Sequence, residues 1–234
     1  MELVAEAFPE LDPVEAIVGG LVEVDGFVRT SPASRVRAGA SIRLRVGEPP
    51  LRGEAKLEAA LAAFRIVVSG RITLDVGAAA GGFTRVLLRH GARRVYAVDA
   101  GHGQLLGSLR QDGRVVVLER TNLAELTPAL VPEPVELMTV DVSYLSLAEA
   151  VAQLTARVRF ARRCDLVALV KPQFELGLAR SPRTADGAVR RAAAAIEATG
   201  WTVAGAVESP VTGRRGSVEA LLHATRVAPC ASRS

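Results

Sequence analysis

A glycine-rich turn between two apolar segments is the feature that most constrains how this chain folds. The turn is Asp75–Thr84, which reads Asp-Val-Gly-Ala-Ala-Ala-Gly-Gly-Phe-Thr, and it joins the apolar run Ile72–Leu74 to the helical pattern of Val86–Leu88. This order is typical of a strand that ends in a turn and continues into a helix. Such a turn points the free N–H groups of the first helical residues at a ligand. The glycines alone leave a purely structural turn open as the alternative.

The spacing of the glycines indicates which ligand the turn suits. Gly77, Gly81 and Gly82 lack a Cβ, so a ligand can approach the backbone closely. The dinucleotide fingerprint G-x-G-x-x-G would need glycine at position 79, which is alanine. The next apolar run, Val95–Val98, ends in Asp99, at about the separation where an acid binds both ribose hydroxyls. Together the two signals predict a nucleoside site without phosphates, and S-adenosylmethionine as the cofactor.

Apolar runs alternate with helical segments over the rest of the chain. We expect strands at Ile72–Leu74, Val95–Val98, Val115–Leu118, Leu137–Val140, Leu166–Val170, Thr202–Val207 and Glu219–Val227. A βαβ series of this kind predicts an α/β fold with a mainly parallel, doubly wound sheet. The segment Glu208–Val218 is too short for a crossover helix, so the last two strands should pair antiparallel.

The first 46 residues have the pattern of a separate small unit. We expect a helix at Leu11–Val18, a strand at Leu21–Val24 and a second strand at Ser41–Val46. A linker at residues 47–52 contains Gly-Glu-Pro-Pro, which breaks regular structure. The segment Glu54–Val68 then has helical periodicity and carries Lys56 in its first turn.

Composition limits the classes of protein that fit. Hydrophobic residues make up 49% of the chain and aromatic residues only 4%, as expected for helices packed on a buried sheet. No apolar run reaches the length of a membrane span, and the acidic start does not fit a signal peptide, so we expect a cytoplasmic protein. Two cysteines and three histidines lack the spacing of metal ligands, so we predict no metal site; they are Cys164, Cys230, His90, His102 and His223.

Charge is distributed unevenly along the chain. The net charge of +4 and the pI of 9.7 permit a nucleic-acid partner. Residues 1–25 carry seven acids and no lysine or arginine, so a polyanion should meet the later part of the chain. Of 29 basic residues only Lys56 and Lys171 are lysine. Lysine, unlike arginine, can lose its proton in a protein, so the two lysines indicate positions that need amine chemistry, unless they remain by chance.

Several polar residues follow predicted strands and should meet at one edge of the sheet. Asp75, Asp99, Asp141 and Lys171 each come at the carboxyl end of an apolar run. Ligands of open α/β sheets bind beyond these ends. Lys56 and Glu219 could join them from a helix start and from the terminal strand.

At these positions the chain resembles a known family. The glycine-rich turn, Asp141-Val-Ser143, Lys171-Pro-Gln-Phe-Glu175 and the segment Ser209–Glu219 are similar, in order and spacing, to the FtsJ-type methyltransferases. Within this family the motifs resemble those of the TlyA or hemolysin A group of ribosomal RNA 2′-O-methyltransferases. It implies a Rossmann-like class I methyltransferase sheet over residues 53–234, ending in an antiparallel hairpin.

The resemblance also implies the catalytic residues. The family's lysine, aspartate, lysine and glutamate tetrad maps onto Lys56, Asp141, Lys171 and Glu219. Two ammonium groups that lie close together and are partly desolvated lower each other's affinity for a proton, so one lysine can act as a base toward a ribose hydroxyl. We assign that role to Lys171, with the other three orienting it. A structural ion-pair network at the sheet edge is the alternative.

Cofactor contacts follow from the same resemblance. The family implies that Gly77, Ala78, Gly81, Gly82 and Phe83 surround the methionine part of S-adenosylmethionine, that Asp99 binds the ribose, and that Asn122 lies near the adenine. Asp141 would touch both the cofactor and the reacting groups. An asparagine before Leu-Ala-Glu-Leu is also an ordinary helix N-cap, which is the other reading of Asn122.

The N-terminal unit resembles a shortened S4 RNA-binding domain. The order of helix, strand and turn over Asp12–Gly26 is that of an S4 domain, but its helical half is acidic where RNA phosphates require basic residues. The family's basic, glycine-rich loop is also replaced, by the shorter segment 176–184. For RNA binding we therefore expect an arginine surface formed by Arg35, Arg37, Arg43, Arg45, Arg52, Arg180, Arg183, Arg214 and Arg215.

Three functions follow from these features. The first is 2′-O-methylation of RNA, with ribosomal RNA as the expected substrate. The second keeps the methyltransferase but replaces RNA with a small hydroxylated or amine metabolite, because the S4-like unit is acidic and the loop is short. The third is a non-enzymatic RNA-binding or membrane-active protein, which the complete tetrad disfavours.

Overall fold

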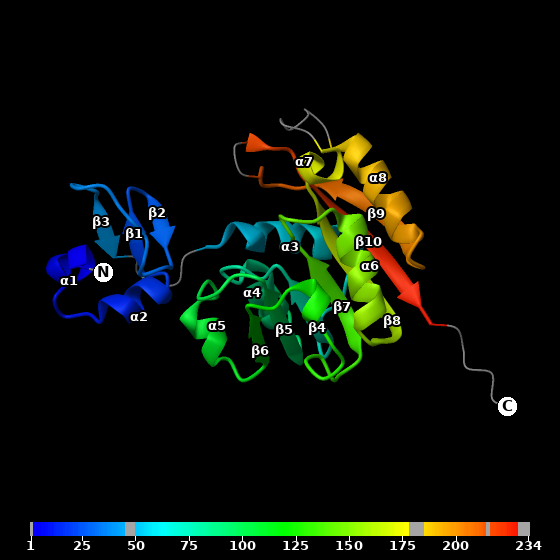
Figure 1. Ribbon diagram of the computed structural model, residues 1–234, viewed down its shortest axis with the longest axis horizontal. Helices are drawn as coiled ribbons and strands as arrows, with labels where there is room; N and C mark the ends of the chain where they lie inside the picture. The colour runs from blue at the N-terminus through cyan, green and yellow to red at the C-terminus, as the bar shows by residue number, and fades with distance from the viewer. Residues whose placement is uncertain (1, 45–49, 178–184, 214–215, 229–234) are drawn as a thin grey trace.

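The computed structural model describes residues 2–44, 50–177, 185–213 and 216–228 (Figure 1). Within these ranges the main part of the chain forms a seven-stranded sheet of order β6-β5-β4-β7-β8-β10-β9. The strands are β4 (Ile72–Val76), β5 (Arg94–Asp99), β6 (Val115–Glu119), β7 (Val135–Val140), β8 (Phe160–Val170), β9 (Thr202–Glu208) and β10 (Ala220–Val227). Strands β4 to β8 pair in parallel, whereas β10 is antiparallel to both β8 and β9. The predicted α/β sheet with a terminal antiparallel hairpin is confirmed.

Helices cover both faces of this sheet. They are α3 (Arg52–Phe64), α4 (Gly82–Arg89), α5 (Gly107–Gln111), α6 (Leu147–Arg157), α7 (Pro172–Glu175) and α8 (Asp186–Glu197), with a 3-10 turn η1 at Leu123–Glu125. One core cluster joins α6 and α8 to alternate strand residues such as Leu74 and Met138, and the other joins α3, α4 and α5 to Val95 and Leu137. Because alternate residues of a strand face opposite sides, two apolar layers sandwich the sheet.

A smaller sheet lies in the N-terminal part of the chain. The residues described before position 45 form helices α1 (Glu2–Ala7) and α2 (Pro13–Val18) and three short strands, β1 (Val22–Val24), β2 (Phe27–Arg29) and β3 (Ile42–Leu44). The strand order is β2-β1-β3, and both pairs are antiparallel. A core cluster that includes Val4, Ile17 and Val22 holds the two helices on this sheet. In Figure 1 this unit lies beside the start of α3.

Several element boundaries differ from the predicted ones. The helix expected at Glu54–Val68 is α3, which ends at Phe64 because Arg65 has left-handed backbone angles, with φ of 54°. Strand β8 begins six residues before the predicted run, at Phe160. Helix α1 and strand β2 were not predicted, since both are short and their apolar periodicity is weak.

Some predictions fall outside the described residues. They are the end of the expected strand Ser41–Val46, the first half of linker 47–52, Cys230, and the arginines Arg45, Arg180, Arg183, Arg214 and Arg215. Of the described helices, none is long and apolar enough to cross a membrane. No cluster of three His, Cys, Asp or Glu residues suited to a metal ion occurs among the residues that the structure places.

Candidate active site

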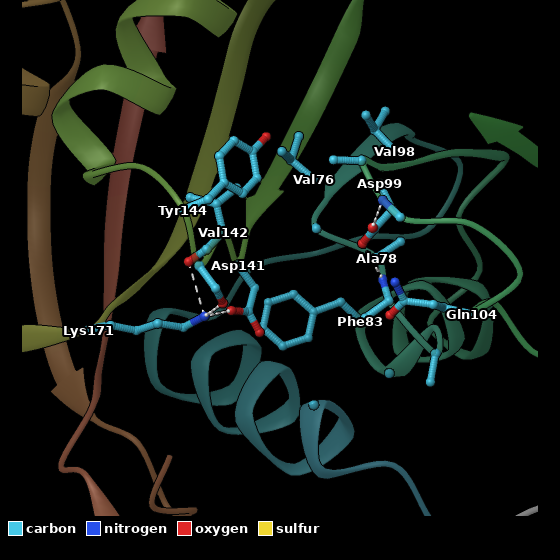
Figure 2. Close-up of a pocket in the computed structure, with 18 of the residues that line it drawn as sticks. Val76, Ala78, Phe83, Val98, Asp99, Gln104, Asp141, Val142, Tyr144 and Lys171 are labelled. Carbon is cyan, nitrogen blue, oxygen red and sulfur yellow. Dashed lines mark hydrogen bonds and ion pairs between the residues drawn. The ribbon is translucent and has the colours of Figure 1, made fainter. Parts of the chain in front are cut away.

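A cavity of about 970 Å³ opens at the carboxyl ends of the parallel strands (Figure 2). Its walls come from the turn after β4, the ends of β5 and β7, the first turn of α3 and the start of α7. Most of the predicted site residues line it: Lys56, Gly77, Ala78, Gly82, Phe83, Asp99, Asp141, Lys171 and Glu219. The volume is within the usual range for sites of small molecules and cofactors.

The glycines of the turn allow close packing of protein segments. Gly77 has φ of 83°, and a Cβ on it would clash with the carbonyl oxygen of Asp141. A Cβ on Gly82 would come 2.9 Å from the Cα of Gly53, at the start of α3. The turn is therefore fitted against β7 and α3, which brings both elements to the cavity. Gly77 and Gly82 also line the cavity, and the close approach of a ligand to them stays a prediction.

Asp99 is held in a fixed orientation at one wall of the cavity. Its Oδ2 accepts the N–H of Ala79 at 2.9 Å, and its Oδ1 accepts the N–H of Gly101 at 2.6 Å. Ala79 has left-handed backbone angles, with φ of 48°, which costs a non-glycine residue of order 1 kcal/mol. The hydrogen bond to Asp99 offsets that strain. Figure 2 shows Asp99 near Ala78 and Gln104.

Asp75 lies beneath the cavity and does not line it. It is fully buried, and its carboxyl accepts hydrogen bonds from Thr84 Oγ1 at 2.6 Å and from Thr139 Oγ1 at 2.8 Å. Burial raises the pKa of Asp75 to about 6, and the nearby Asp141 carboxylate adds to the rise, while the two threonine hydroxyls oppose it. Asp75 therefore joins β4 to α4 and β7, and has no direct access to a ligand.

Lys171 directly follows β8, and its ammonium group has two hydrogen-bond acceptors and one ion-pair partner around it. Its Nζ is 2.5 Å from Asp141 Oδ1, 3.0 Å from the carbonyl oxygen of Val142 and 2.8 Å from Ser143 Oγ (Figure 2). Only 8% of Lys171 is exposed. The residues that come from the ends of β7 and β8 are thus brought together as expected.

Lys56 and Glu219 form a second ion pair, and both of its members are buried. The Nζ of Lys56 donates to Glu219 Oε2 at 2.6 Å, and the two residues are 8% and 4% exposed. Glu219 directly precedes β10, and that strand's reversed direction brings it to the carboxyl edge of the others. Gly213 packs so closely that a Cβ on it would clash with Glu219 Oε1. Arg52 fixes the same loop by donating to the Thr212 carbonyl at 2.5 Å.

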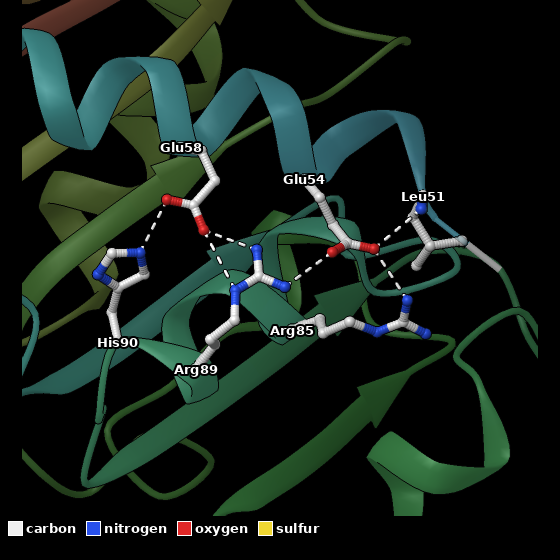
Figure 3. Close-up of polar contacts among 6 residues, drawn as sticks. All are labelled: Leu51, Glu54, Glu58, Arg85, Arg89 and His90. Carbon is white, nitrogen blue, oxygen red and sulfur yellow. Dashed lines mark hydrogen bonds and ion pairs between the residues drawn. The ribbon is translucent and has the colours of Figure 1, made fainter. Parts of the chain in front are cut away.

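An ion-pair network holds the helix that carries Lys56 (Figure 3). Glu54 on α3 accepts from Arg85 at 2.8 Å and from Arg89 at 3.0 Å, both on α4, and also accepts the N–H of Leu51 at 2.9 Å. One turn further, Glu58 accepts from Arg89 at 2.6 Å. Burial by itself would raise the pKa of Glu54, but its hydrogen bonds outweigh this and lower the pKa. The network fixes α3 against the helix that follows the glycine turn.

Two predicted cofactor residues lie outside the cavity wall. Gly81 is the N-cap of α4, where a Cβ would clash with Leu109. Asn122 is exposed, and its N–H donates to Glu125 at 2.7 Å at the start of η1. Its neighbours Thr121 and Leu123 line the cavity instead. Asn122 is thus the N-cap residue of η1, which was the alternative interpretation of this residue.

Other residues of the wall were not predicted as site residues. They include Gln104, Ser143, Tyr144 and Gln173. Gln104 lies in a loop whose N–H groups are bound by Glu119, which accepts from Gly103 at 2.8 Å and from Gln104 at 3.1 Å. Burial alone would raise the pKa of Glu119, but Arg110 and these N–H groups lower it to about 2. The signal that could have identified Ser143 and Tyr144 is their place directly after Asp141.

Comparison with known proteins agrees with this architecture. The model of the FtsJ-like methyltransferase family matches residues 51–226. The chain belongs to the FtsJ-like methyltransferase family. It is 41% identical over 219 residues to the 16S/23S rRNA (cytidine-2′-O)-methyltransferase TlyA of Mycobacterium tuberculosis, covering 89% of this chain and 81% of that protein. It is 34% identical over 223 residues to hemolysin A of Brachyspira hyodysenteriae, covering 89% and 90%.

Solved structures show the same fold. A candidate hemolysin from Streptococcus thermophilus matches with a TM-score of 0.72 and 33% identity, covering 91% of this chain and 81% of that one. An S-adenosylmethionine-dependent methyltransferase from Mesorhizobium loti matches with a TM-score of 0.53 at 17% identity, covering 72% and 96%. The second likeness concerns the fold alone.

Proposed function

We propose that this chain transfers a methyl group from S-adenosylmethionine to a ribose 2′-hydroxyl of ribosomal RNA. The observation that carries the proposal is the pairing of Lys171 with Asp141 and of Lys56 with Glu219 in the wall of one cavity. In a family of methyltransferases, two lysine–carboxylate pairs beside a nucleoside-type turn suit the removal of a proton from a hydroxyl.

The cavity walls fit S-adenosylmethionine. Asp99 keeps acceptor capacity on a carboxylate that lines the cavity, which suits the two ribose hydroxyls. Val76, Val98 and Leu123 supply an apolar wall for the adenine. We assign the methionine part to the turn, with Gly77, Ala78, Gly81, Gly82 and Phe83 around it, and we keep Asn122 as an outer neighbour of the adenine. When bound, the cofactor would supply an electrophilic methyl group on sulfur.

Lys171 is the proposed base for the ribose hydroxyl. Asp141, Val142 and Ser143 hold its nitrogen at one point of the cavity wall, so the direction of proton removal is fixed. Lys56 and Glu219, the other ion pair in the cavity wall, would orient the same hydroxyl. Lys56, Lys171 and Glu219 are buried, which strengthens the electrostatic interactions of these three groups.

RNA is the proposed partner, and the N-terminal unit is its proposed docking domain. We assign residues 1–46 to a shortened S4-like unit, 47–52 to a linker and 53–234 to the methyltransferase domain. Val28 of the N-terminal sheet lines the cavity, which supports a substrate that contacts both parts. The relative from M. tuberculosis acts on cytidine, so cytidine is the first target to examine. A ribosomal substrate would also place the protein in the cytoplasm.

The decisive experiment is transfer of a labelled methyl group to purified ribosomal subunits, total RNA and a pool of small metabolites. We expect the label on ribosomal RNA. The phosphodiester bond that follows the labelled nucleotide should resist cleavage by alkali. Label in the metabolite fraction alone would favour the small-molecule alternative. Failure to bind S-adenosylmethionine in calorimetry would favour a non-enzymatic RNA-binding protein.

A further inference from the structure

The oxygen atoms around Lys171 Nζ suit one of its two protonation states better than the other. Nζ donates hydrogen bonds to the Val142 carbonyl oxygen and to Ser143 Oγ, and it forms an ion pair with Asp141 Oδ1, a buried oxygen without a hydrogen-bond partner of its own. An ammonium group, with its charge and three N–H donors, suits all three oxygen atoms. A neutral amine has two N–H donors and a lone pair that an acceptor oxygen repels, so one of the three neighbours must then donate to it.

Ser143 is the partner that can change. A carboxylate and a backbone carbonyl only accept hydrogen bonds, whereas a hydroxyl both donates and accepts. When Lys171 is an ammonium group, Ser143 Oγ accepts a hydrogen bond from its Nζ at 2.8 Å. Toward a neutral amine at the same position, the Ser143 hydroxyl would donate to the lone pair of Nζ.

The position of Ser143 joins the buried amine to the cavity. Lys171 is 8% exposed, whereas Ser143 is exposed and lines the cavity wall. An incoming hydroxyl therefore reaches the oxygen of Ser143 with less displacement of protein than it needs to reach Nζ. A chain of two hydrogen bonds, from substrate to Ser143 and from Ser143 to Lys171, satisfies every group in the neutral-amine state.

We propose that Ser143 relays the proton from the substrate hydroxyl to Lys171. In the transfer step the substrate O–H bond breaks and its proton goes to Ser143 Oγ, while the proton of Ser143 goes to the lone pair of Lys171 Nζ. The substrate oxygen forms a bond to the methyl carbon, and the carbon–sulfur bond breaks with its electron pair staying on sulfur. The products are the methyl ether, the ammonium form of Lys171 and a neutral thioether. The relay rests on the proposed function of the same site.

The test is a single-turnover rate of methyl transfer to ribosomal subunits in mixtures of H₂O and D₂O. When one proton moves in the step, the rate falls linearly with deuterium fraction, and when two move it falls along a curve. For the wild-type chain we expect a curve. A straight line would overturn the relay without any variant being needed.

Variants separate the relay from simple packing. Ser143→Ala should slow transfer by roughly 10²-fold and give a straight line, since one relay hydroxyl is lost. Ser143→Thr keeps the hydroxyl and should stay within about tenfold of wild type with a curve. Ser146→Ala is the matched control, because Ser146 caps α6 in the same loop and its Oγ accepts from Glu149. It should leave the rate and the curve unchanged.

The outcomes distinguish this inference from the function on which it rests. Two results would overturn the relay and leave the function standing, provided that the wild-type chain is active. One is a transfer rate of Ser143→Ala within about threefold of wild type, and the other is a rate of Ser143→Thr as low as that of Ser143→Ala. A wild-type chain that methylates no RNA overturns both.

Discussion

The two edges of the main sheet carry similar ion pairs with different surroundings. At the carboxyl edge, Lys171 and Asp141 lie in the wall of a cavity beside a nucleoside-type turn. Near the amino ends of β4 and β7, Asp165 accepts from Arg71 at 2.6 Å and from His223 at 2.9 Å, and the ring of Phe64 lies 5.1 Å from that of His223. None of these four residues lines the cavity. A buried ion pair therefore indicates a site only where a ligand can reach it.

Two buried carboxyl groups of this sheet show what a cation partner changes. Burial alone would raise the pKa of Asp165, but His223 and Arg71 outweigh it and hold that pKa below its usual 3.8. Asp75 has hydroxyl partners in place of cations, and burial raises its pKa to about 6. Burial raises the pKa of both carboxyl groups, and only Asp165 has a guanidinium beside it that opposes this effect.

Loss of the lysine at the cavity edge should have the largest effect on activity. Lys171→Ala should reduce single-turnover methyl transfer about 10³-fold, because it removes the proposed general base. Lys171→Arg is the control for charge, since arginine keeps the charge and does not release its proton, and it should be equally slow. Calorimetry should show S-adenosylmethionine binding by both variants. Transfer by Lys171→Arg within tenfold of wild type would contradict the base assignment.

Loss of Asp165, at the amino edge of the sheet, should change stability and not activity. Asp165→Asn should lower the free energy of unfolding by about 3 kcal/mol, because Arg71 and His223 lose their shared anion. Because the native pKa of Asp165 is below 3.8, its contribution is present above that pH and is lost as the pH falls through the native pKa.

Urea unfolding at pH 7 and in acid checks both statements about Asp165. The difference between wild type and Asp165→Asn should shrink in acid. Methyl transfer per folded molecule should stay within about twofold of wild type. A loss of transfer as large as that of Lys171→Ala would show that the amino edge also serves the reaction.

Asp75 should make stability depend on pH in the opposite direction. Its pKa is about 6 in the fold against 3.8 for the free side chain, so the native state binds more protons between these values. Stability should therefore fall by roughly 2–3 kcal/mol as the pH rises from about 4 to 6, and remain reduced above that. Asp75→Asn should remove this slope in urea unfolding measured across the range. An unchanged slope would mean that Asp75 is ionised in the native protein at pH 4.

The ion pairs of Glu54 and Glu58 that join α3 to α4 should give the smallest effects on stability. Glu54→Gln should cost about 1–2 kcal/mol of unfolding free energy, since Arg85, Arg89 and the N–H of Leu51 lose a charged acceptor. Glu58→Gln is the matched variant one turn along, and its more exposed pair with Arg89 should contribute about 0.5 kcal/mol. Thermal unfolding of the two variants measures the difference. Equal losses of unfolding free energy would show that Glu54, in the turn of α3 nearest the cavity, contributes no more than Glu58.

The main sheet could be predicted because its signals are local. Apolar runs separated by helical patterns identified the strands, and the short connection Glu208–Val218 identified the antiparallel hairpin. The end of α3 was placed too late because Ile66 and Val68 continue the apolar pattern, although Arg65 adopts left-handed angles that no propensity predicts.

The site could be predicted in its residue types and less so in its contacts. Residues at strand ends share an edge, so the meeting of Asp141 and Lys171 follows from topology. The contact of Gly77 with the Asp141 carbonyl, or of Arg71 with Asp165 and His223, depends on tertiary packing between distant segments. A sequence pattern carries no signal for such contacts.

The reversed direction of β10 has a consequence for synthesis of the protein. Because β9 runs toward the carboxyl edge and β10 starts there, Glu219 reaches Lys56 only when the hairpin of β9 and β10 has folded. A nascent chain that has emerged only as far as α8 would hold the turn, Asp141 and Lys171, yet Lys56 would face an empty position. On the proposed assignment, an unfinished polypeptide stays inert toward the very ribosome that is making it.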